Sequence, residues 1–227
     1  MCNLYSMTTN REAVLRLFRV GDNRAEAFKP ATAIFPSQVA PVVRNSDDGT
    51  RELVHMSWGF VFPQTSKAAR RVTNARDDKV LTSNFWRSSF EERRCLVPVT
   101  SFCEPKGRAP ASWHWFGLDR NRSTFAFAGI WRSFKGHLKL DAPPVEIETY
   151  AFLTTSPNEL VREVHPTRMP AMLVGQDAMD CWVDGSTADA TALIAPYPAD
   201  TMMKVQVGPD REDRHGAGGE TDELRLL

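Results

Sequence analysis

Short runs of β-forming residues alternate with proline-containing turns along most of the chain. Four of these runs are apolar at successive positions, which predicts strands that are buried on both faces. They are Leu53–Phe62, Cys95–Val99, Thr124–Trp131 and Thr149–Thr155. The pattern predicts a curved central sheet.

Helical signals are fewer and shorter. We expect helices at Thr9–Phe18, Ser89–Arg94, Asn158–Arg162 after a Ser-Pro start, and Asp177–Trp182. The fold class is therefore α+β. No composition change divides the 227 residues, so one domain is expected over residues 1–207. Residues 208–223 are polar and glycine-rich without a large apolar side chain, so we interpret residues 208–227 as a flexible tail.

The charge balance restricts the possible partners. The chain has 28 basic and 28 acidic residues, so its formal net charge is zero. A protein that holds duplex DNA chiefly by global electrostatics would be strongly basic, and a nucleic-acid contact here needs a local patch.

The cysteines and histidines lack the spacing of metal ligands, so no metal or cofactor is expected. No signal peptide or long apolar span is visible, which predicts a cytoplasmic protein without a membrane partner. We expect a monomer. The four cysteines are expected to remain free thiols: Cys2, Cys95, Cys103 and Cys181.

Cys2 follows the initiator methionine, which is normally trimmed before so small a side chain. Trimming would leave an α-amine and a thiol on one residue. Their reference pKa values are about 7.7–8.0 and about 8.5, so part of each is expected to be nucleophilic near neutral pH. Such an aminothiol can condense with an aldehyde to an imine and close to a thiazolidine. The alternative is a small residue at a frayed terminus.

Three further polar residues stand in rigid apolar surroundings. Asn74 can hold an amine or a sugar hydroxyl, although turns also favour asparagine. Glu104 leaves an apolar strand, where a raised pKa would suit proton transfer and an ion pair is the alternative. His165 lies in a loop between prolines and can exchange protons near neutrality, although most single histidines are structural.

The ordered set of motifs resembles the SOS response-associated peptidase (SRAP) family. The motifs are Met1-Cys2, Trp58 to Pro63, Asn74-Ala75-Arg76, Arg94 to Pro98 with Phe102 to Glu104, Phe127 to Trp131, and His165 to Pro170. The resemblance extends from residue 2 to about residue 207. It implies a compact domain around a mostly antiparallel sheet or barrel with flanking helices.

The resemblance also implies a function. Members capture abasic sites in single-stranded DNA through a thiazolidine at the N-terminal cysteine. By position, Cys2 matches the nucleophile, Asn74 the orienting asparagine, Glu104 the acid/base, and His165 the histidine that assists ring opening. Candidates for DNA contacts are Asn3, Arg76 and Arg168, with Trp58 and Trp86 as apolar or stacking surfaces beside the lesion.

Some positions depart from the family pattern. Asn3-Leu4 stands where many members have Gly-Arg, and two residues separate His165 from Arg168 where one is usual. Before ring closure, the imine would permit β-elimination, which predicts a residual lyase activity. The rival functions are a cysteine-type (auto)peptidase, an N-terminal-nucleophile hydrolase and a non-covalent single-strand-binding module. Self-processing would have only Met1 to remove, and the chain lacks the Asn-Gly pair of the hydrolases.

Overall fold

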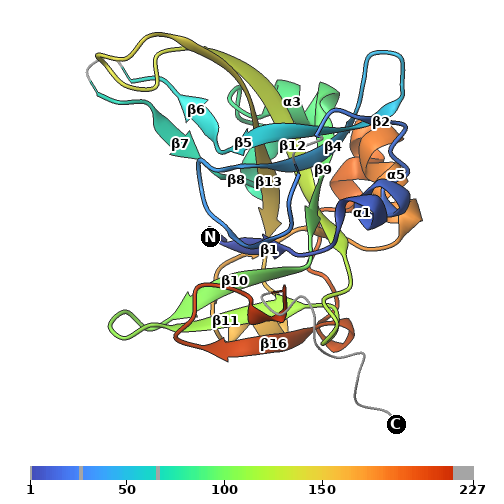
Figure 1. Ribbon diagram of the computed structural model, residues 1–227, viewed down its shortest axis with the longest axis vertical. Helices are drawn as coiled ribbons and strands as arrows, with labels where there is room; N and C mark the ends of the chain where they lie inside the picture. The colour runs from blue at the N-terminus through green and yellow to red at the C-terminus, as the bar shows by residue number, and fades with distance from the viewer. Residues whose placement is uncertain (1, 26–27, 65–66, 217–227) are drawn as a thin grey trace.

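A computed structural model describes residues 2–25, 28–64 and 67–216. Its centre is a five-stranded barrel in the order β13-β12-β9-β4-β5 (Figure 1). Neighbouring strands pair antiparallel except at the closure, where β13 runs parallel to β5 and pairs Tyr150 with Trp58. The five strands are β4 (Val39–Asn45), β5 (Arg51–Trp58), β9 (Arg94–Val99), β12 (Phe125–Gly136) and β13 (Val145–Thr155).

Shorter strands extend this sheet. β8 and β14 both pair with β13, β15 pairs with β12, and β2 pairs with β5. Their bounds are β2 (Asp22–Asn23), β8 (Asn74–Arg76), β14 (Met169–Pro170) and β15 (Met172–Leu173). A separate hairpin consists of β6 (Phe60–Phe62) and β7 (Arg70–Val72).

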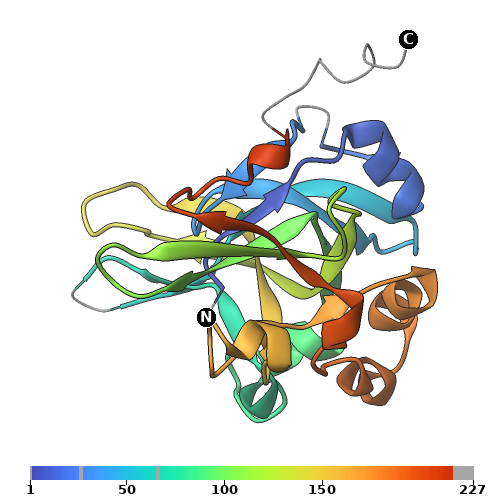
Figure 2. The same ribbon diagram turned by 90° about the horizontal axis from the view of Figure 1, so that it is seen from below.

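A second sheet of five strands lies across one end of the barrel, in the order β16-β11-β10-β1-β3 (Figure 2). Its strands are β1 (Tyr5–Met7), β3 (Ala31–Ile34), β10 (Ser101–Lys106), β11 (Ser112–Gly117) and β16 (Met203–Gly208). β9 and β10 are separated only by Thr100, so one continuous segment passes from the barrel into the second sheet.

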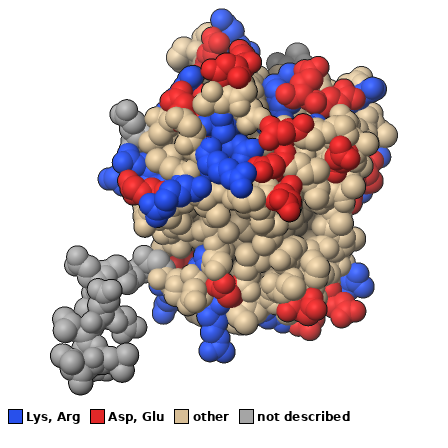
Figure 3. Space-filling model, turned by 90° about the vertical axis from the view of Figure 1, so that its right-hand side faces the viewer, with Lys and Arg blue, Asp and Glu red and all other residues tan. Residues whose placement is uncertain are grey.

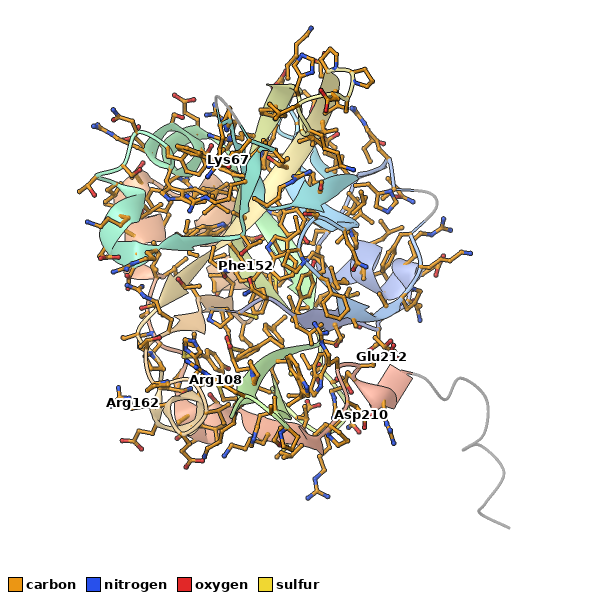
Figure 4. The ribbon with its side chains drawn as sticks, turned by 90° about the vertical axis from the view of Figure 1, so that its left-hand side faces the viewer. Lys67, Arg108, Phe152, Arg162, Asp210 and Glu212 are labelled. Carbon is orange, nitrogen blue, oxygen red and sulfur yellow. The ribbon has the colours of Figure 1, made fainter. Side chains whose placement is uncertain are left out.

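Aromatic side chains fill the space between the sheets. Phe152 lies near the centre of the molecule (Figure 4), with its ring 4.6 Å from Phe127 and 5.2 Å from Trp58. Tyr5 brings β1 into the same cluster and its hydroxyl lies 2.6 Å from that of Tyr150. These rings are fully buried, so they anchor the first strand of the chain to the barrel.

The helices pack around the barrel, and polar side chains mark their starts. Asn10 caps α1, Asn158 caps α4, and Ser186 with Asp189 forms a capping box on α6. The helices are α1 (Arg11–Leu17), α2 (Asp77–Val80), α3 (Arg87–Glu92), α4 (Glu159–Arg162), α5 (Gln176–Asp184) and α6 (Thr187–Ala192), with 3-10 turns at Ala199–Thr201 and Arg214–Gly216. All four expected helices are present, and the α+β class with a barrel is confirmed.

Two expectations about boundaries were wrong. The strand expected over Leu53–Phe62 breaks at Gly59, whose φ of 105° is accessible mainly to glycine. The domain also continues past residue 207, because Asp213 is fully buried and ion-paired with Arg122 at 2.8 Å. Figure 4 shows Asp210 and Glu212 against the lower part of the fold. The rest of the expected tail, residues 217–227, lies outside the described residues.

Charges of both signs are neighbours on the surface beside α1 and α5 (Figure 3). Arg51, for example, pairs with Asp180 at 2.9 Å and with Asp184 at 3.1 Å. None of the described helices combines the length and the hydropathy needed to cross a lipid bilayer.

Candidate active site

Pairing among the strands of the two sheets brings the predicted site residues together. β1 pairs with β10, and the Cys103 amide donates to the Leu4 carbonyl oxygen at 2.9 Å, which places the start of β1 beside Glu104. β8 and β14 pair with the same end of β13, at Phe152 and at Thr155 respectively. Asn74 and the loop that carries His165 therefore lie at that end of the barrel.

Cys2 is buried, with 1% of its surface exposed. Its thiol donates to the Leu4 carbonyl oxygen at 3.4 Å. Burial, and next the negative charge of Glu104, raises the pKa of the thiol well above its ordinary value. The expectation of a partly ionised thiol near neutral pH was wrong, because a thiolate without water around it is costly.

Asn74 holds the backbone of Cys2. Its amide nitrogen donates to the Cys2 carbonyl oxygen at 2.9 Å and to Thr73 Oγ1 at 2.8 Å. Thr73 in turn donates to Asn3 Oδ1 at 3.1 Å. Asn74 Oδ1 is buried and has no hydrogen-bond partner within the described chain. That oxygen is available to accept a hydrogen bond from an amine or a hydroxyl group.

Glu104 is a second buried acceptor. It is 1% exposed, and its Oε1 has no hydrogen-bond partner in the described ranges. Burial raises the pKa of Glu104 to about 7, against the opposing effect of the positively charged amino terminus. The alternative of an arginine ion pair is not realised among the described residues. Near neutral pH, the carboxyl group can both donate and accept a proton.

His165 is held by its own loop. Its amide donates to the Val161 carbonyl oxygen at 2.8 Å, and its Nδ1 lies 3.0 Å from the Arg168 carbonyl oxygen. Burial, and next the charge of the amino terminus, lowers the pKa of His165. β14 follows this loop and pairs with Thr154 and Thr155 of β13, at the end of β13 that also pairs with β8, so the loop carries His165 to the end of the barrel that holds Asn74.

The two candidate phosphate-binding arginines are paired with carboxylates. Arg76 binds Asp78 through two contacts of 2.8 and 2.6 Å. Arg168 contacts Asp77, and its second nitrogen lies 3.1 Å from Asp78. We call these four residues, Arg76, Arg168, Asp77 and Asp78, the rim cluster. Their two positive and two negative charges neutralise one another. The two aspartates immediately follow Asn-Ala-Arg in the sequence, and that adjacency was the signal that could have predicted the pairing of Arg76 with Asp78.

Of the two roles expected for the tryptophans, apolar surface or stacking surface, stacking is opposed by the burial of both side chains. Trp58 has no exposed surface, and its Nε1 donates to the Thr73 carbonyl oxygen at 3.1 Å. Trp86 is 7% exposed and packs 5.0 Å from Phe60. Trp58 therefore supports the strand that carries Asn74, and its burial leaves no ring face for a DNA base.

Comparison with known proteins identifies the family. A model of the SOS response associated peptidase (SRAP) family matches residues 1–211. The chain belongs to this family.

Curated relatives of this SRAP chain are named abasic site processing proteins. YoqW of Bacillus subtilis is 26% identical over 217 residues, which cover 91% of this chain and 92% of YoqW. HMCES of Gallus gallus is 26% identical over 204 residues, covering 76% of this chain and 60% of HMCES. A crystal structure of a Bacteroides thetaiotaomicron protein shares the fold with a TM-score of 0.73 and 21% identity, covering 89% and 90% of the two chains.

Two expectations for the SRAP chain remain predictions. Met1 lies outside the described residues, so its removal is not addressed by the site geometry. For cofactors, the structure covers the chain except residues 1, 26–27, 65–66 and 217–227, and in that part no three His, Cys, Asp or Glu side chains are grouped as metal ligands would be.

Proposed function

We propose that this protein captures abasic sites in single-stranded DNA through a thiazolidine at Cys2, shielding the lesion during the DNA damage response. The observation that carries the proposal is the pair of buried acceptors, Asn74 Oδ1 and Glu104 Oε1, that lack partners within the described residues at the end of the barrel holding Cys2. Unpartnered buried oxygens are costly unless a ligand satisfies them. The names of the curated relatives supply the lesion.

The first step opens the sugar. Glu104, protonated in part near neutral pH, gives a proton to the ring oxygen of the deoxyribose, and His165 takes the proton of the hydroxyl on C1′. The C–O bond of the ring breaks and an aldehyde forms. His165 suits the role of base because its lowered pKa keeps the imidazole neutral.

The second step forms the adduct. After removal of Met1, the Cys2 amine adds to the aldehyde carbon, and loss of one water molecule gives the imine. The thiol then adds across the C=N bond, sulfur to carbon and its proton to nitrogen, so no external oxidant or reductant is needed. The raised pKa of the thiol fits an order in which the amine adds first, because a protonated thiol is the weaker nucleophile until the imine has formed.

The rival activities have weaker support. A cysteine peptidase needs a thiolate, and burial opposes its formation at Cys2. A lyase activity would arise where the imine undergoes β-elimination before the thiol closes the ring. A cytoplasmic location with access to the nucleoid, and action as a monomer, complete the proposal.

The test is an abasic single-stranded oligonucleotide incubated with the protein and resolved on a denaturing, reducing gel. A heat-stable adduct is expected with the wild-type protein and with Cys181→Ala, the matched control at a cysteine remote from the site. Cys2→Ala should give none. Mass spectrometry should show an adduct whose protein chain begins at Cys2. The mass of the adduct should equal the sum of the protein and the oligonucleotide less one water molecule. A wild-type protein that binds the oligonucleotide without a heat-stable adduct would favour the non-covalent module.

A further inference from the structure

His114 lies beside Glu104 in the second sheet. The two residues are direct partners in the antiparallel pair of β10 and β11, so their side chains project from the same face of the sheet. Directly opposed residues have Cβ atoms about 4.5–5.5 Å apart. An imidazole and a carboxyl group at such positions are within reach of each other, directly or through one solvent molecule.

Both side chains present a buried atom without a partner. Glu104 Oε1 and His114 Nδ1 are each enclosed and form no hydrogen bond with any described residue. Glu104 is almost wholly buried, whereas His114 is partly exposed. The imidazole therefore has one nitrogen in the interior while part of its side chain reaches solvent.

The groups around His114 keep it neutral near pH 7. Lys106 of β10 and Lys204 of β16 face it, as does Glu163, which follows α4. Burial and then the two lysines lower the pKa of His114, and Glu163 opposes them. A neutral imidazole can take a proton on one nitrogen and release one from the other.

We propose that His114 is a positioning residue that acts through Glu104 by carrying protons between solvent and the buried carboxyl group. The inference rests on the proposed function, in which the Glu104 carboxyl group gives up a proton during ring opening. The carboxyl group must recover a proton if it is also to assist the loss of water that gives the imine. His114 passes its Nδ1 proton to the Glu104 carboxylate, and the ring takes a proton from solvent at its other nitrogen. Only protons move, and the imidazole ends in its starting charge state.

The kinetic test measures adduct formation from pH 5 to 9 for wild type, His114→Gln, His114→Ala and His137→Gln. His137 lies on the β12–β13 hairpin, where it contacts the Ala142 carbonyl oxygen, so its variant controls for loss of an imidazole elsewhere. The His114 variants should be slower by about tenfold, less than the roughly 10²–10⁴-fold of a directly acting acid or base. Their pH profile should change shape, and added imidazole should restore much of the His114→Ala rate.

Each outcome bears on the proposal. Wild-type rates and profiles in both His114 variants would overturn the relay while leaving the proposed function intact. A uniform slowing without imidazole rescue would show a structural role and would also overturn it. Absence of any adduct in the wild type would remove the proposed function and the relay together.

A second measurement needs no His114 variant. NMR titration of the His114 ring signals in the DNA-free protein should show a further step near pH 7, caused by ionisation of the neighbouring Glu104. Glu104→Gln should abolish that step. A single step in both proteins would mean that the two groups do not interact, and the relay would be wrong.

Discussion

The centre of the site and its rim differ in whether their polar groups have partners. At the centre, Asn74 and Glu104 each keep a buried oxygen without a partner among the described residues. At the rim cluster, Arg76 and Arg168 are paired with Asp77 and Asp78. The centre thus retains hydrogen-bond acceptors without partners, which lowers the stability of the fold, whereas the charged groups of the rim pair with one another. Under the proposed function, this difference favours specificity from covalent capture at the centre over specificity from phosphate binding at the rim.

The largest effect should follow removal of the proton-transfer groups at the centre. Glu104→Gln and His165→Ala should each slow adduct formation by about 10²–10⁴-fold without abolishing it, because Cys2 still supplies the bonding atoms. Time courses on denaturing gels across pH measure this. Wild-type rates in both variants at every pH would mean that only Cys2 is functional.

The same carboxyl group should weaken the free protein at high pH. Its pKa is about 7 in the folded state against an ordinary value of 4.5. Below pH 4.5 both states are protonated, and as the pH rises to 7 only the unfolded state ionises freely, so stability falls. A pKa difference of one corresponds to about 1.4 kcal/mol, which gives a cost of about 3 kcal/mol above pH 7.

Glu104→Gln should therefore raise the thermal midpoint by several degrees at pH 8 and leave it nearly unchanged at pH 4. Thermal unfolding at the two pH values tests this. Glu146→Gln, at an exposed carboxylate of β13 that pairs with the exposed Lys135, is a suitable control. Equal midpoints for wild type and Glu104→Gln at pH 8 would mean that ionisation of the buried Glu104 carboxyl group does not destabilise the folded protein.

Freeing the rim arginines should have a moderate effect. Partly exposed ion pairs contribute about 0.2–1 kcal/mol, so Asp77→Asn with Asp78→Asn should strengthen non-covalent binding of single-stranded DNA about two- to fivefold. The salt dependence of binding should steepen as the arginines become available to phosphates. Fluorescence anisotropy with an intact oligonucleotide measures both. Unchanged affinity and slope would show that Arg76 and Arg168 do not face DNA.

The smallest effect concerns Asn3, an exposed residue bound by Thr73 at the edge of the site. Asn3→Arg would add one positive charge there. One new phosphate contact should raise the slope of log affinity against log salt by about 0.7. Asn3→Gln is the neutral control. If the arginine variant kept the wild-type slope, the strand would not pass this edge.

Local sequence determined the chemistry that the site can perform. Four candidate side chains were identifiable because the functional group of a residue follows from its type alone. They are Cys2, Asn74, Glu104 and His165. The short apolar runs likewise predicted the main strands and the α+β class. These signals depend only on residue type and on spacing over a few positions.

The tertiary structure decided burial, pairing and protonation. Trp58 became an interior support, Arg168 met Asp77 across 91 positions of sequence, and Asp213 joined the folded domain. The Cys2 thiol became hard to ionise for the same reason, since a pKa depends on the solvent and charges that surround a group. Each of these outcomes depends on which distant segments meet; the pairing of both β8 and β14 with β13, for example, brings Asp77 and Arg168 together.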